Sequence, residues 1–370
     1  MRVLHFYKNA LPETIGGVEQ VIDQIARGTA CLGISNTVLA LSNHPDNLPT
    51  LMHGYKLVTV KRDFEFASNG FSIKSLNAFK NLVSKVDLIH YHFPWPFADL
   101  VHQWVKPMKP TVLTYHSDIV RQKLLLKLYH PLKQHFLRSV DHIVTTSPNY
   151  LHTSSVLQTF ADKVSVIPIG LDQESYSKPD PLQIRFYREH FGERFFLFIG
   201  AFRYYKGLPF LIEAAKITPC PIVIAGSGPA EAELKTLVSK YQLNNVFFLG
   251  QVSEKNKAAL LAACYCVIFP SNLRSEAFGV TLLEGAMFSK PLISCEIGTG
   301  TTYINIDQET GLVTAPSDPK DLANAMAWLW THPDEAQEMG QKARARYETL
   351  FTAKKMSHSY VELYQKLLNR

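Results

Sequence analysis

Short apolar segments alternate with longer amphipathic ones along almost the whole chain. β-branched and aromatic residues concentrate in segments that predict strands at residues 3–7, 37–41, 56–60, 87–90, 111–115, 142–145 and 164–167, and then at 195–199, 222–225, 246–249, 266–269 and 291–294. Apolar residues at helical spacing predict helices between several of them, at 18–31, 208–217, 231–241, 253–263 and 280–288. Strands that alternate with helices are typical of βα units on parallel sheets.

A segment rich in helix and strand breakers separates the two halves. It contains Pro168, Gly170, Pro179 and Pro181, and we place the hinge there. The sequence therefore predicts a first domain at residues 1–170 and a second at 171–350. From about residue 318 the pattern predicts three helices and no strand. We expect the last of these, within 351–370, to pack back on the first domain.

These features predict an α/β fold of two doubly wound, Rossmann-like domains that face each other across a cleft, followed by C-terminal helices. Sheets of this kind bind their ligands at the carboxyl ends of the strands. The candidate site residues below all follow predicted strands.

The composition is that of a soluble globular enzyme. The 370 residues are 46% hydrophobic and 19% charged, which excludes a disordered chain. The net charge of +6 suits a phosphate-rich ligand, but the basic residues are dispersed and we expect no nucleic-acid partner. Five cysteines without metal or redox spacing, no signal-like start and no membrane-length apolar stretch predict a cytoplasmic protein with reduced thiols.

The segment from Ser275 to Gly285 carries the most informative pattern. Glu276 lies in a polar loop after the strand at 266–269, and Glu284 lies eight positions later in an apolar helical stretch. One carboxylate can bind sugar hydroxyls at the loop, and the other can reach a ribose. The backbone N–H groups near Gly279 to Thr281, at the start of the helix, remain free for a phosphate. This pattern points to a nucleotide sugar as the ligand.

A basic pair follows the first predicted strand of the second domain. Arg203 and Lys206 lie there, and Gly207 opens the next helix. Two fixed cations beside a departing nucleoside diphosphate stabilise its growing negative charge and can replace a metal ion. Exposed basic pairs are usually solvated surface, so it is the position at the strand end that favours the functional interpretation.

Two glycine patterns also follow strands. Gly16 and Gly17 open a helix, either as a plain turn or as a place where a phosphate approaches the backbone. Gly226 and Gly228 begin a dinucleotide-like pattern, but Glu231 stands where its third glycine belongs. We therefore interpret that segment as a tight turn and infer no dehydrogenase.

His116 directly follows the strand at 111–115, where it can hydrogen-bond a sugar hydroxyl or the reaction centre. His90 and His92 lie near another strand end and are rivals for this role. Residues 121–138 mix basic and large apolar side chains at helical spacing. They predict either peripheral contact with an anionic membrane or an ordinary amphipathic helix packed on the first domain. Both interpretations stay open.

No metal site is expected. The sequence contains no Asp-x-Asp, so a carboxylate-bound Mg²⁺ or Mn²⁺ has no obvious ligands. It also offers no convincing catalytic nucleophile with a supporting base.

Over essentially its full length the chain resembles the retaining glycosyltransferases of family 4, which have the GT-B fold, and the resemblance rests on Glu276 with Glu284, Arg203 with Lys206, Gly16-Gly17 and His116. Its opening residues, 4–20, look like mannosyl- or rhamnosyltransferases of bacterial lipopolysaccharide O-antigen assembly. One departure is Tyr204-Tyr205 between the arginine and the lysine, where the family often has a longer basic sequence. This departure bears on the identity of the donor more than on the reaction.

The resemblance implies roles for these residues. Glu276 and His116 would act on the sugar, with His116 helping to place the acceptor, and Glu284 would bind the ribose. Arg203 and Lys206 would hold the diphosphate, with the N–H groups near Gly279, Val280 and Thr281 adding to it. Gly17 would let the diphosphate approach the first domain, and Gly16 and Phe278 are further donor-binding residues. Attack would come from the front face, with the leaving phosphate accepting the proton of the acceptor.

The implied activity is transfer of a hexose, with retention, from a nucleoside diphosphate to a lipid-linked oligosaccharide at the cytoplasmic membrane face. GDP-mannose is the first expected donor and GDP-rhamnose the second, and UDP-hexoses remain open. The nucleotide sugar is a co-substrate, and no cofactor is expected. The alternatives are a nucleotide-sugar epimerase and a nucleotide-sugar-binding regulatory protein without catalysis.

Overall fold

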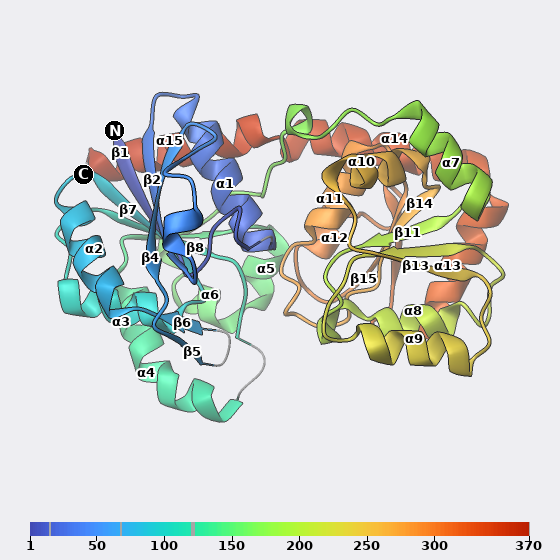
Figure 1. Ribbon diagram of the computed structural model, residues 1–370, viewed down its shortest axis with the longest axis horizontal. Helices are drawn as coiled ribbons and strands as arrows, with labels where there is room; N and C mark the ends of the chain where they lie inside the picture. Colours follow the sequence, from blue (N-terminus) through green and yellow to red (C-terminus); the bar gives the residue numbers. More distant parts are fainter. Residues whose placement is uncertain (15, 67–68, 120–122, 370) are drawn as a thin grey trace. The chain divides into compact units, whose positions relative to one another are not determined.

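The computed structural model describes residues 1–14, 16–66, 69–119 and 123–369. The chain divides into two compact units, residues 1–170 with 353–370 (unit 1) and residues 171–352 (unit 2). Figure 1 shows the elements of both, and each unit is built around its own twisted sheet.

Unit 1 contains an eight-stranded sheet and a small two-stranded one. The strands of the main sheet are β1 (Arg2–Phe6), β2 (Ser35–Ser42), β3 (Leu51–Met52), β4 (Tyr55–Lys61), β7 (Leu88–Phe93), β8 (Thr111–Tyr115), β9 (His142–Thr145) and β10 (Val164–Val166). The two-stranded sheet pairs β5 (Phe64–Phe66) with β6 (Asn69–Phe71). The helices are α1 (Gly17–Ala30), α2 (Ile73–Val83), α3 (Pro96–Val105), α4 (Lys123–Ser139), α5 (Pro148–Thr153), α6 (Ser155–Thr159) and α15 (Ala353–Leu368), with short 3₁₀ turns η1 (Pro45–Asn47) and η2 (Ala161–Lys163).

The main sheet of unit 1 is parallel except at its edge. Its order is β10-β9-β8-β7-β1-β2-β4-β3, and only β3 runs antiparallel to its neighbour. The chain winds outward from β1 in one direction and then from β7 in the other, so the order reverses between β1 and β7. All residues of β7 are buried, as expected of a central strand covered on both faces.

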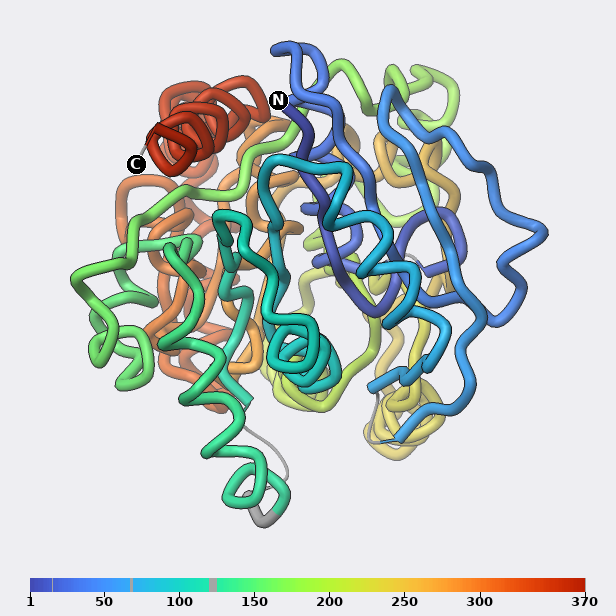
Figure 2. The backbone as a smooth tube through the Cα atoms, turned by 90° about the vertical axis from the view of Figure 1, so that its left-hand side faces the viewer, coloured from blue at the N-terminus to red at the C-terminus, as the bar shows by residue number. Residues whose placement is uncertain are grey.

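Helices α1 and α15 pack against each other on one face of this sheet (Figure 1). The apolar face predicted for α1 is buried through Val21, Ile22 and Ile25. The hydroxyl of Tyr364, in α15, lies 2.7 Å from Nδ1 of His90 in β7. Both ends of the chain therefore belong to unit 1, and Figures 1 and 2 show them on the same side of it.

Unit 2 contains a six-stranded parallel sheet of order β13-β12-β11-β14-β15-β16. Its strands are β11 (Phe196–Ile199), β12 (Ile222–Ala225), β13 (Val246–Gly250), β14 (Cys266–Phe269), β15 (Leu292–Cys295) and β16 (Gly311–Thr314). The helices are α7 (Pro181–Phe191), α8 (Leu208–Ala214), α9 (Glu231–Lys240), α10 (Glu254–Ala263), α11 (Val280–Met287), α12 (Thr301–Ile304), α13 (Pro319–Thr331) and α14 (Pro333–Leu350), with 3₁₀ turns η3 (Gln173–Ser175) and η4 (Tyr204–Lys206).

Helices cover both faces of the second sheet. Figure 1 shows α8, α9 and α13 on one face and α7, α10, α11 and α14 on the other, in agreement with the contacts of α13 with α8 and of α10 with α7. Here the strand order reverses between β11 and β14. In open α/β sheets such a reversal leaves a crevice at the carboxyl ends of the two strands.

The elements predicted from the sequence occur in the structure, with small differences. All predicted strands are present, and the three predicted C-terminal helices are α13, α14 and α15. The sequence did not predict β3, β5, β6 or β16. All four are short: β5 is exposed throughout, β3 is partly exposed, β6 has only three residues and β16 is a short edge strand. None shows the continuous apolar stretch of the central strands.

Candidate active site

The switch point of unit 2 gathers three of the predicted features. The loop after β11 carries Arg203 and Lys206, the loop after β14 carries Glu276, and α11 begins directly behind it. Because β11 and β14 are hydrogen-bonded neighbours, these loops leave the sheet at the same edge. The Thr281 hydroxyl ties the start of α11 to the end of β11, donating to the carbonyl oxygen of Ile199 at 3.0 Å.

A glycine at the end of η4 allows the two loops to touch. Gly207 has a φ of +68°, and a Cβ built on it would lie 1.9 Å from the carbonyl oxygen of Pro270. A side chain is excluded there by both the backbone conformation and the space. The close approach brings the loop that carries Lys206 against the residues that follow β14.

Lys206 and Glu276 form the central ion pair of this site. Nζ of Lys206 lies 2.5 Å from Oε2 of Glu276, and each side chain is only 12% exposed. The ammonium also lies 4.5 Å from the centre of the Phe269 ring, and the hydroxyl of Ser271 donates to the same carboxylate oxygen at 3.4 Å. Both residues were predicted from the sequence, where they are 70 positions apart, and the fold brings them into contact. A cation and a carboxylate therefore lie side by side.

Arg203 lies at the other end of η4 as its N-cap residue and is exposed. Within the described ranges of the chain, no ion pair joins its guanidinium to an acid. The site therefore holds one cation engaged by Glu276 and a second that faces solvent.

The start of α11 presents backbone donors. Its N-cap, Gly279, has a φ of +101° and provides no side-chain cap. Among the residues that the structure describes, no acceptor is found for the N–H groups of Val280 and Thr281, whereas the next two amides bond to the carbonyl of Gly279. Free amides at a helix N-terminus favour an anion.

Glu284 lies deeper, on the buried face of α11. It is 4% exposed, and its Oε1 accepts hydrogen bonds from the hydroxyl of Tyr176 at 2.8 Å and from Nζ of Lys257 at 3.0 Å. Burial alone would lower the pKa of Lys257, but the charges of Glu284 and Glu254 outweigh it, so the pKa is raised and the ammonium is retained. The structure thus links Glu284 to α10 and to Tyr176, neither of which the sequence singled out.

The Gly226–Gly228 segment leads into the predicted tight turn, in which the N–H of Glu231 donates to the carbonyl oxygen of Gly228 at 3.0 Å. Gly226 has a φ of +135°, and a Cβ on it would lie 2.0 Å from the carbonyl oxygen of Gly200 in the loop after β11. These glycines let two strand-end loops pack backbone to backbone.

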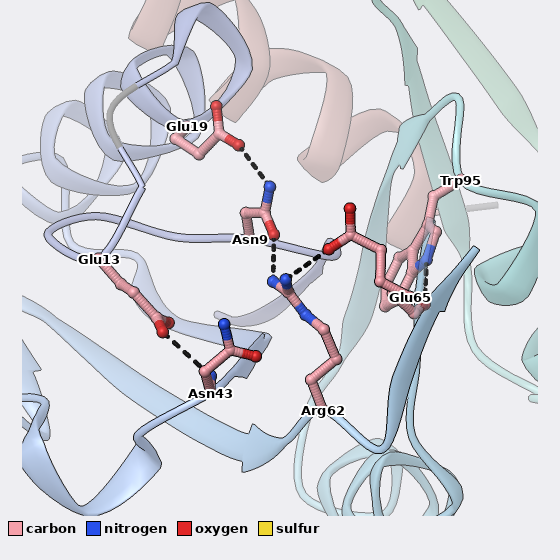
Figure 3. Close-up of polar contacts among 8 residues, drawn as sticks. Asn9, Glu13, Glu19, Asn43, Arg62, Glu65 and Trp95 are labelled. Carbon is pink, nitrogen blue, oxygen red and sulfur yellow. Dashed lines mark hydrogen bonds and ion pairs between the residues drawn. The ribbon is translucent and has the colours of Figure 1, made fainter. Parts of the chain in front are cut away.

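In unit 1 the predicted glycines open α1 at the switch point. Gly16 is the N-cap of α1. Figure 3 shows a polar network that links Glu19, in the first turn of this helix, to Asn9, Arg62 and Glu65. Asn9 donates to Oε1 of Glu19 at 3.2 Å, and Arg62 donates to Oδ1 of Asn9 and to Glu65, both at 2.7 Å. A Cβ on Gly16 would lie 2.3 Å from Oε2 of Glu19, so this carboxylate folds over the first turn of the helix. A phosphate at Gly17 would have to share the helix terminus with it.

His116 lies just beyond β8 and is buried. Its Nε2 lies 3.0 Å from Nδ1 of His92, one of its two rivals. The other rival, His90, faces the hydroxyls of Thr114 and Tyr364, both at 2.7 Å. Burial lowers the pKa of His116 to about 3, so its imidazole is neutral at pH 7. Of the three histidines, His116 is the one beyond the end of its strand.

The helix predicted at 121–138 corresponds to α4 at Lys123–Ser139, and residues 121 and 122 of the prediction lie outside the described part of the chain. Phe136 and Leu137 are buried, whereas Leu125 and Leu128 are 40% and 78% exposed. The described helices include none that is both long and apolar enough to cross a bilayer.

Comparison with known proteins decides the family. A family model described as glycosyl transferases group 1 matches residues 182–346, and one described as glycosyltransferase family 4 matches residues 15–175. The chain is also 52% identical over 353 residues to D-rhamnosyltransferase WbpZ of Pseudomonas aeruginosa, covering 95% of this chain and 93% of the relative. The chain belongs to glycosyltransferase family 4.

Further comparisons place this glycosyltransferase among transferases of the same length and fold. It is 48% identical to O-antigen chain mannosyltransferase C of Escherichia coli over 100% of this chain and 99% of the relative. Sucrose-phosphate synthase from Thermosynechococcus elongatus superposes with a TM-score of 0.83 at 22% identity, covering 100% of this chain and 99% of that one. Anabaena HepE in complex with UDP-glucose superposes with a TM-score of 0.79 at 19% identity, covering 99% and 100%. The GT-B fold class predicted from the sequence is confirmed.

Proposed function

We propose that this glycosyltransferase transfers a hexose, with retention, from a nucleoside diphosphate to a lipid-linked oligosaccharide in O-antigen assembly. The observation that supports it most is the ion pair of Lys206 and Glu276 at the switch point of unit 2. A cation suited to a diphosphate and a carboxylate suited to sugar hydroxyls are what a nucleotide sugar requires. The curated relatives at 52% and 48% identity are named as a rhamnosyltransferase and an O-antigen mannosyltransferase.

The residues divide the donor between them in this proposal. Lys206, Arg203 and the free amides of Val280 and Thr281 bind the diphosphate, as cations and helix N-termini do. Glu276 accepts hydrogen bonds from hydroxyls of the hexose. Glu284 keeps Lys257 and Tyr176 on its Oε1 and offers Oε2 to the ribose. In unit 1, Gly16 and Gly17 allow the diphosphate close to the backbone.

The reaction is a front-face substitution. The bond between the anomeric carbon and the phosphate oxygen breaks, and the acceptor oxygen bonds to the same face of that carbon. The proton of the acceptor hydroxyl passes to the leaving phosphate oxygen, which explains why the site needs no enzymic nucleophile. Fixed cations at the diphosphate stabilise the charge that develops in the transition state.

We propose GDP-mannose as the donor and transfer without a metal ion, because Arg203 and Lys206 replace the cation and the sequence has no Asp-x-Asp. The 52% identity to a D-rhamnosyltransferase supports GDP-rhamnose as the second candidate. UDP-hexoses are the third, since HepE binds UDP-glucose.

A panel of nucleotide sugars tests the donor. The one that binds should raise the melting temperature most, because a ligand that binds only the folded state stabilises it. The same donor should then transfer its sugar to a lipid-linked acceptor with EDTA present, and NMR of the product should show the anomeric configuration of the donor. Consumption of donor without acceptor would indicate an epimerase, binding without turnover a regulatory protein, and an inverted product would refute retention.

A further inference from the structure

Four buried polar side chains cross the sheet of unit 1 in a diagonal row. Asn36 is in β2, His5 in β1, His92 in β7, and His116 follows β8. These four strands are consecutive neighbours in the sheet. All four residues are at most 6% exposed, with values of 2%, 0%, 1% and 6% in the order given.

Register and alternation put the four on the same face. His5 pairs with Val38, two residues beyond Asn36, and with His90, two residues before His92. His92 pairs with Thr114, two residues before His116. Because side chains two residues apart in a strand point to the same side, the row lies on the face that α1 and α15 cover.

Hydrogen bonds join the row from end to end. Oδ1 of Asn36 lies 3.3 Å from Nε2 of His5, Nδ1 of His5 lies 3.2 Å from Nε2 of His92, and Nδ1 of His92 lies 3.0 Å from Nε2 of His116. His5 and His92 therefore each use one nitrogen for the preceding residue and the other for the next, whereas His116 uses only Nε2.

The amide of Asn36 has only one consistent orientation. Its Nδ2 lies 2.8 Å from the carbonyl oxygen of Ala26 and 2.9 Å from the hydroxyl oxygen of Thr29. That hydroxyl donates its own hydrogen to the carbonyl of Ile25 at 2.7 Å, so it accepts from Asn36. The NH₂ group must face α1, and the amide oxygen must face His5.

This orientation determines every tautomer in the row. Burial lowers the pKa of His5 to about 4, that of His116 to about 3 and that of His92 well below its ordinary value, so each ring carries one proton at pH 7. His5 donates from Nε2 to Asn36 and accepts at Nδ1. His92 therefore donates from Nε2 and accepts at Nδ1, and His116 in turn donates from Nε2.

We propose that Asn36, His5 and His92 are positioning residues that hold His116 in its Nε2–H tautomer, so that Nδ1 accepts a hydrogen bond from a hydroxyl of the substrate. In the described part of the chain, no donor reaches Nδ1 of His116. The inference rests on the proposed function for its hydroxyl-bearing ligand, a sugar or its acceptor. It adds that His116 binds the substrate hydroxyl only as an acceptor, because its single ring proton is on Nε2 and is donated to His92.

The main competing interpretation is a metal site. Ligand nitrogens of His5, His90 and His92 all lie within 4.8 Å of one another. The hydrogen bonds favour the row instead, because His90 is held by the hydroxyls of Tyr364 and Thr114 and the other two rings are held by their neighbours. A metal ion would have to break these bonds to reach three lone pairs.

The direct test is a long-range proton–nitrogen NMR spectrum of the full-length protein labelled with nitrogen-15 histidine, at pH 7. Protonated and bare ring nitrogens resonate far apart, so each tautomer is read without reference to activity. We expect a protonated Nε2 and a bare Nδ1 in His5, His92 and His116. A proton on Nδ1 of His116, a doubly protonated ring, or stoichiometric zinc in the purified protein would overturn the proposal.

Two variants of Asn36 and one control sharpen the test. Asn36→Leu removes the acceptor, so His116 should show a mixture of tautomers and kcat/KM should fall roughly tenfold, the cost of about one hydrogen bond. In Asn36→Asp the second carboxyl oxygen faces the carbonyl oxygen of Ala26, so the buried acid should carry a proton there, keep an acceptor oxygen towards His5 and preserve the wild-type tautomers. Tyr364→Phe changes the same buried cluster outside the row and should also leave them unchanged. Unaltered tautomers in folded Asn36→Leu would overturn the proposal.

The NMR spectrum tests the row of hydrogen-bonded histidines, and the transfer assay tests the role of His116 in the proposed function, so the two can fail independently. If His116→Ala transferred sugar at the wild-type rate, the role of His116 in the proposed function would be refuted even with the expected tautomers. If the tautomers were wrong while His116→Ala was inactive, the row would be refuted and the function would stand.

Discussion

Lys206 and Glu276 carry the most direct residue-scale prediction. Lys206→Ala and Glu276→Ala should each lower kcat/KM for sugar transfer by about 10²–10³-fold, since in the proposed function each removes a group that stabilises charge or orients the sugar in the transition state. Initial rates with a fixed donor and acceptor measure this. The matched control is Lys235→Ala, which breaks an ion pair with Glu231 whose two side chains are 57% and 31% exposed. It should change the rate little, and wild-type rates in both site variants would refute the assignment.

Lys257 allows a second prediction, because its ammonium pairs with one buried carboxylate and one exposed carboxylate. Glu284 is 5% exposed and Glu254 is 66% exposed. Glu284→Ala should destabilise unit 2 by about 3–5 kcal/mol, because it leaves a buried ammonium poorly compensated. Glu254→Ala should cost less than about 1 kcal/mol. Urea unfolding distinguishes them, and equal midpoints would contradict the asymmetry.

At this scale the sequence identified the residues at strand ends but not the residues behind them. Lys206 and Glu276 stood out because each follows a predicted strand. Loops that follow parallel strands leave the sheet at the same edge, so this position could be predicted from the sequence. Lys257 and Asn36 gave no such signal, since one lies within a helix and the other near the start of a strand. Their partners became visible only when the fold brought α10 to α11 and β2 to β1.

At the scale of elements, α15 is tied to the sheet of unit 1 through buried hydroxyls. Tyr364→Phe removes the hydroxyl that faces Nδ1 of His90 and should lower the free energy of unfolding by about 1–3 kcal/mol, the cost of a buried polar group left without a hydrogen bond. Tyr241→Phe is the control, because no hydrogen bond joins its hydroxyl to any described residue. If thermal melting shows the same loss for both, the hydroxyl does not anchor the helix.

Central strands were predicted well and edge strands poorly, for a physical reason. β14 is buried along its whole length, and its burial on both faces demands an unbroken apolar segment. β5 is exposed at every residue, so no such demand shapes it. The prediction of a helix at 353–368 succeeded because the periodicity there is strong and no strand competes with it.

At the scale of the whole molecule, the buried histidines predict acid sensitivity. Burial lowers the pKa of five of them below the ordinary value of 6.5, to about 4 for His5 and His102, to about 3 for His116, and well below 6.5 for His90 and His92. Such groups stabilise the fold above the unfolded pKa, and this contribution is lost as the pH falls towards the folded one. Burial raises the pKa of Asp99 to about 8, so its contribution to the stability of the fold increases as the pH falls. This single group opposes the five histidines.

The free energy of unfolding should therefore fall between pH 6.5 and 4, by roughly 1.4 kcal/mol per pH unit for each buried histidine that must become protonated on unfolding. The melting temperature should fall steadily with it. Circular dichroism melts across this range provide the measurement. Replacing the exposed His130 by glutamine should leave the slope unchanged. A flat profile down to pH 4.5 would show that these rings are already charged in the fold.

The GT-B class could be predicted because each half of the sequence shows strands alternating with helices, and a segment rich in proline and glycine separates the two halves. The donor could not, because the residues that choose among nucleotide bases and hexoses carry no pattern of their own.

The bond between Lys206 and Glu276 has a consequence for turnover. An anion that attracts the ammonium leaves the carboxylate short of hydrogen-bond donors. A loaded donor supplies replacements from the hydroxyls of its hexose, whereas the spent nucleotide brings only more negative charge. After transfer, carboxylate and phosphate would compete for the same ammonium, and this rivalry would favour release of the by-product and readiness for the next cycle.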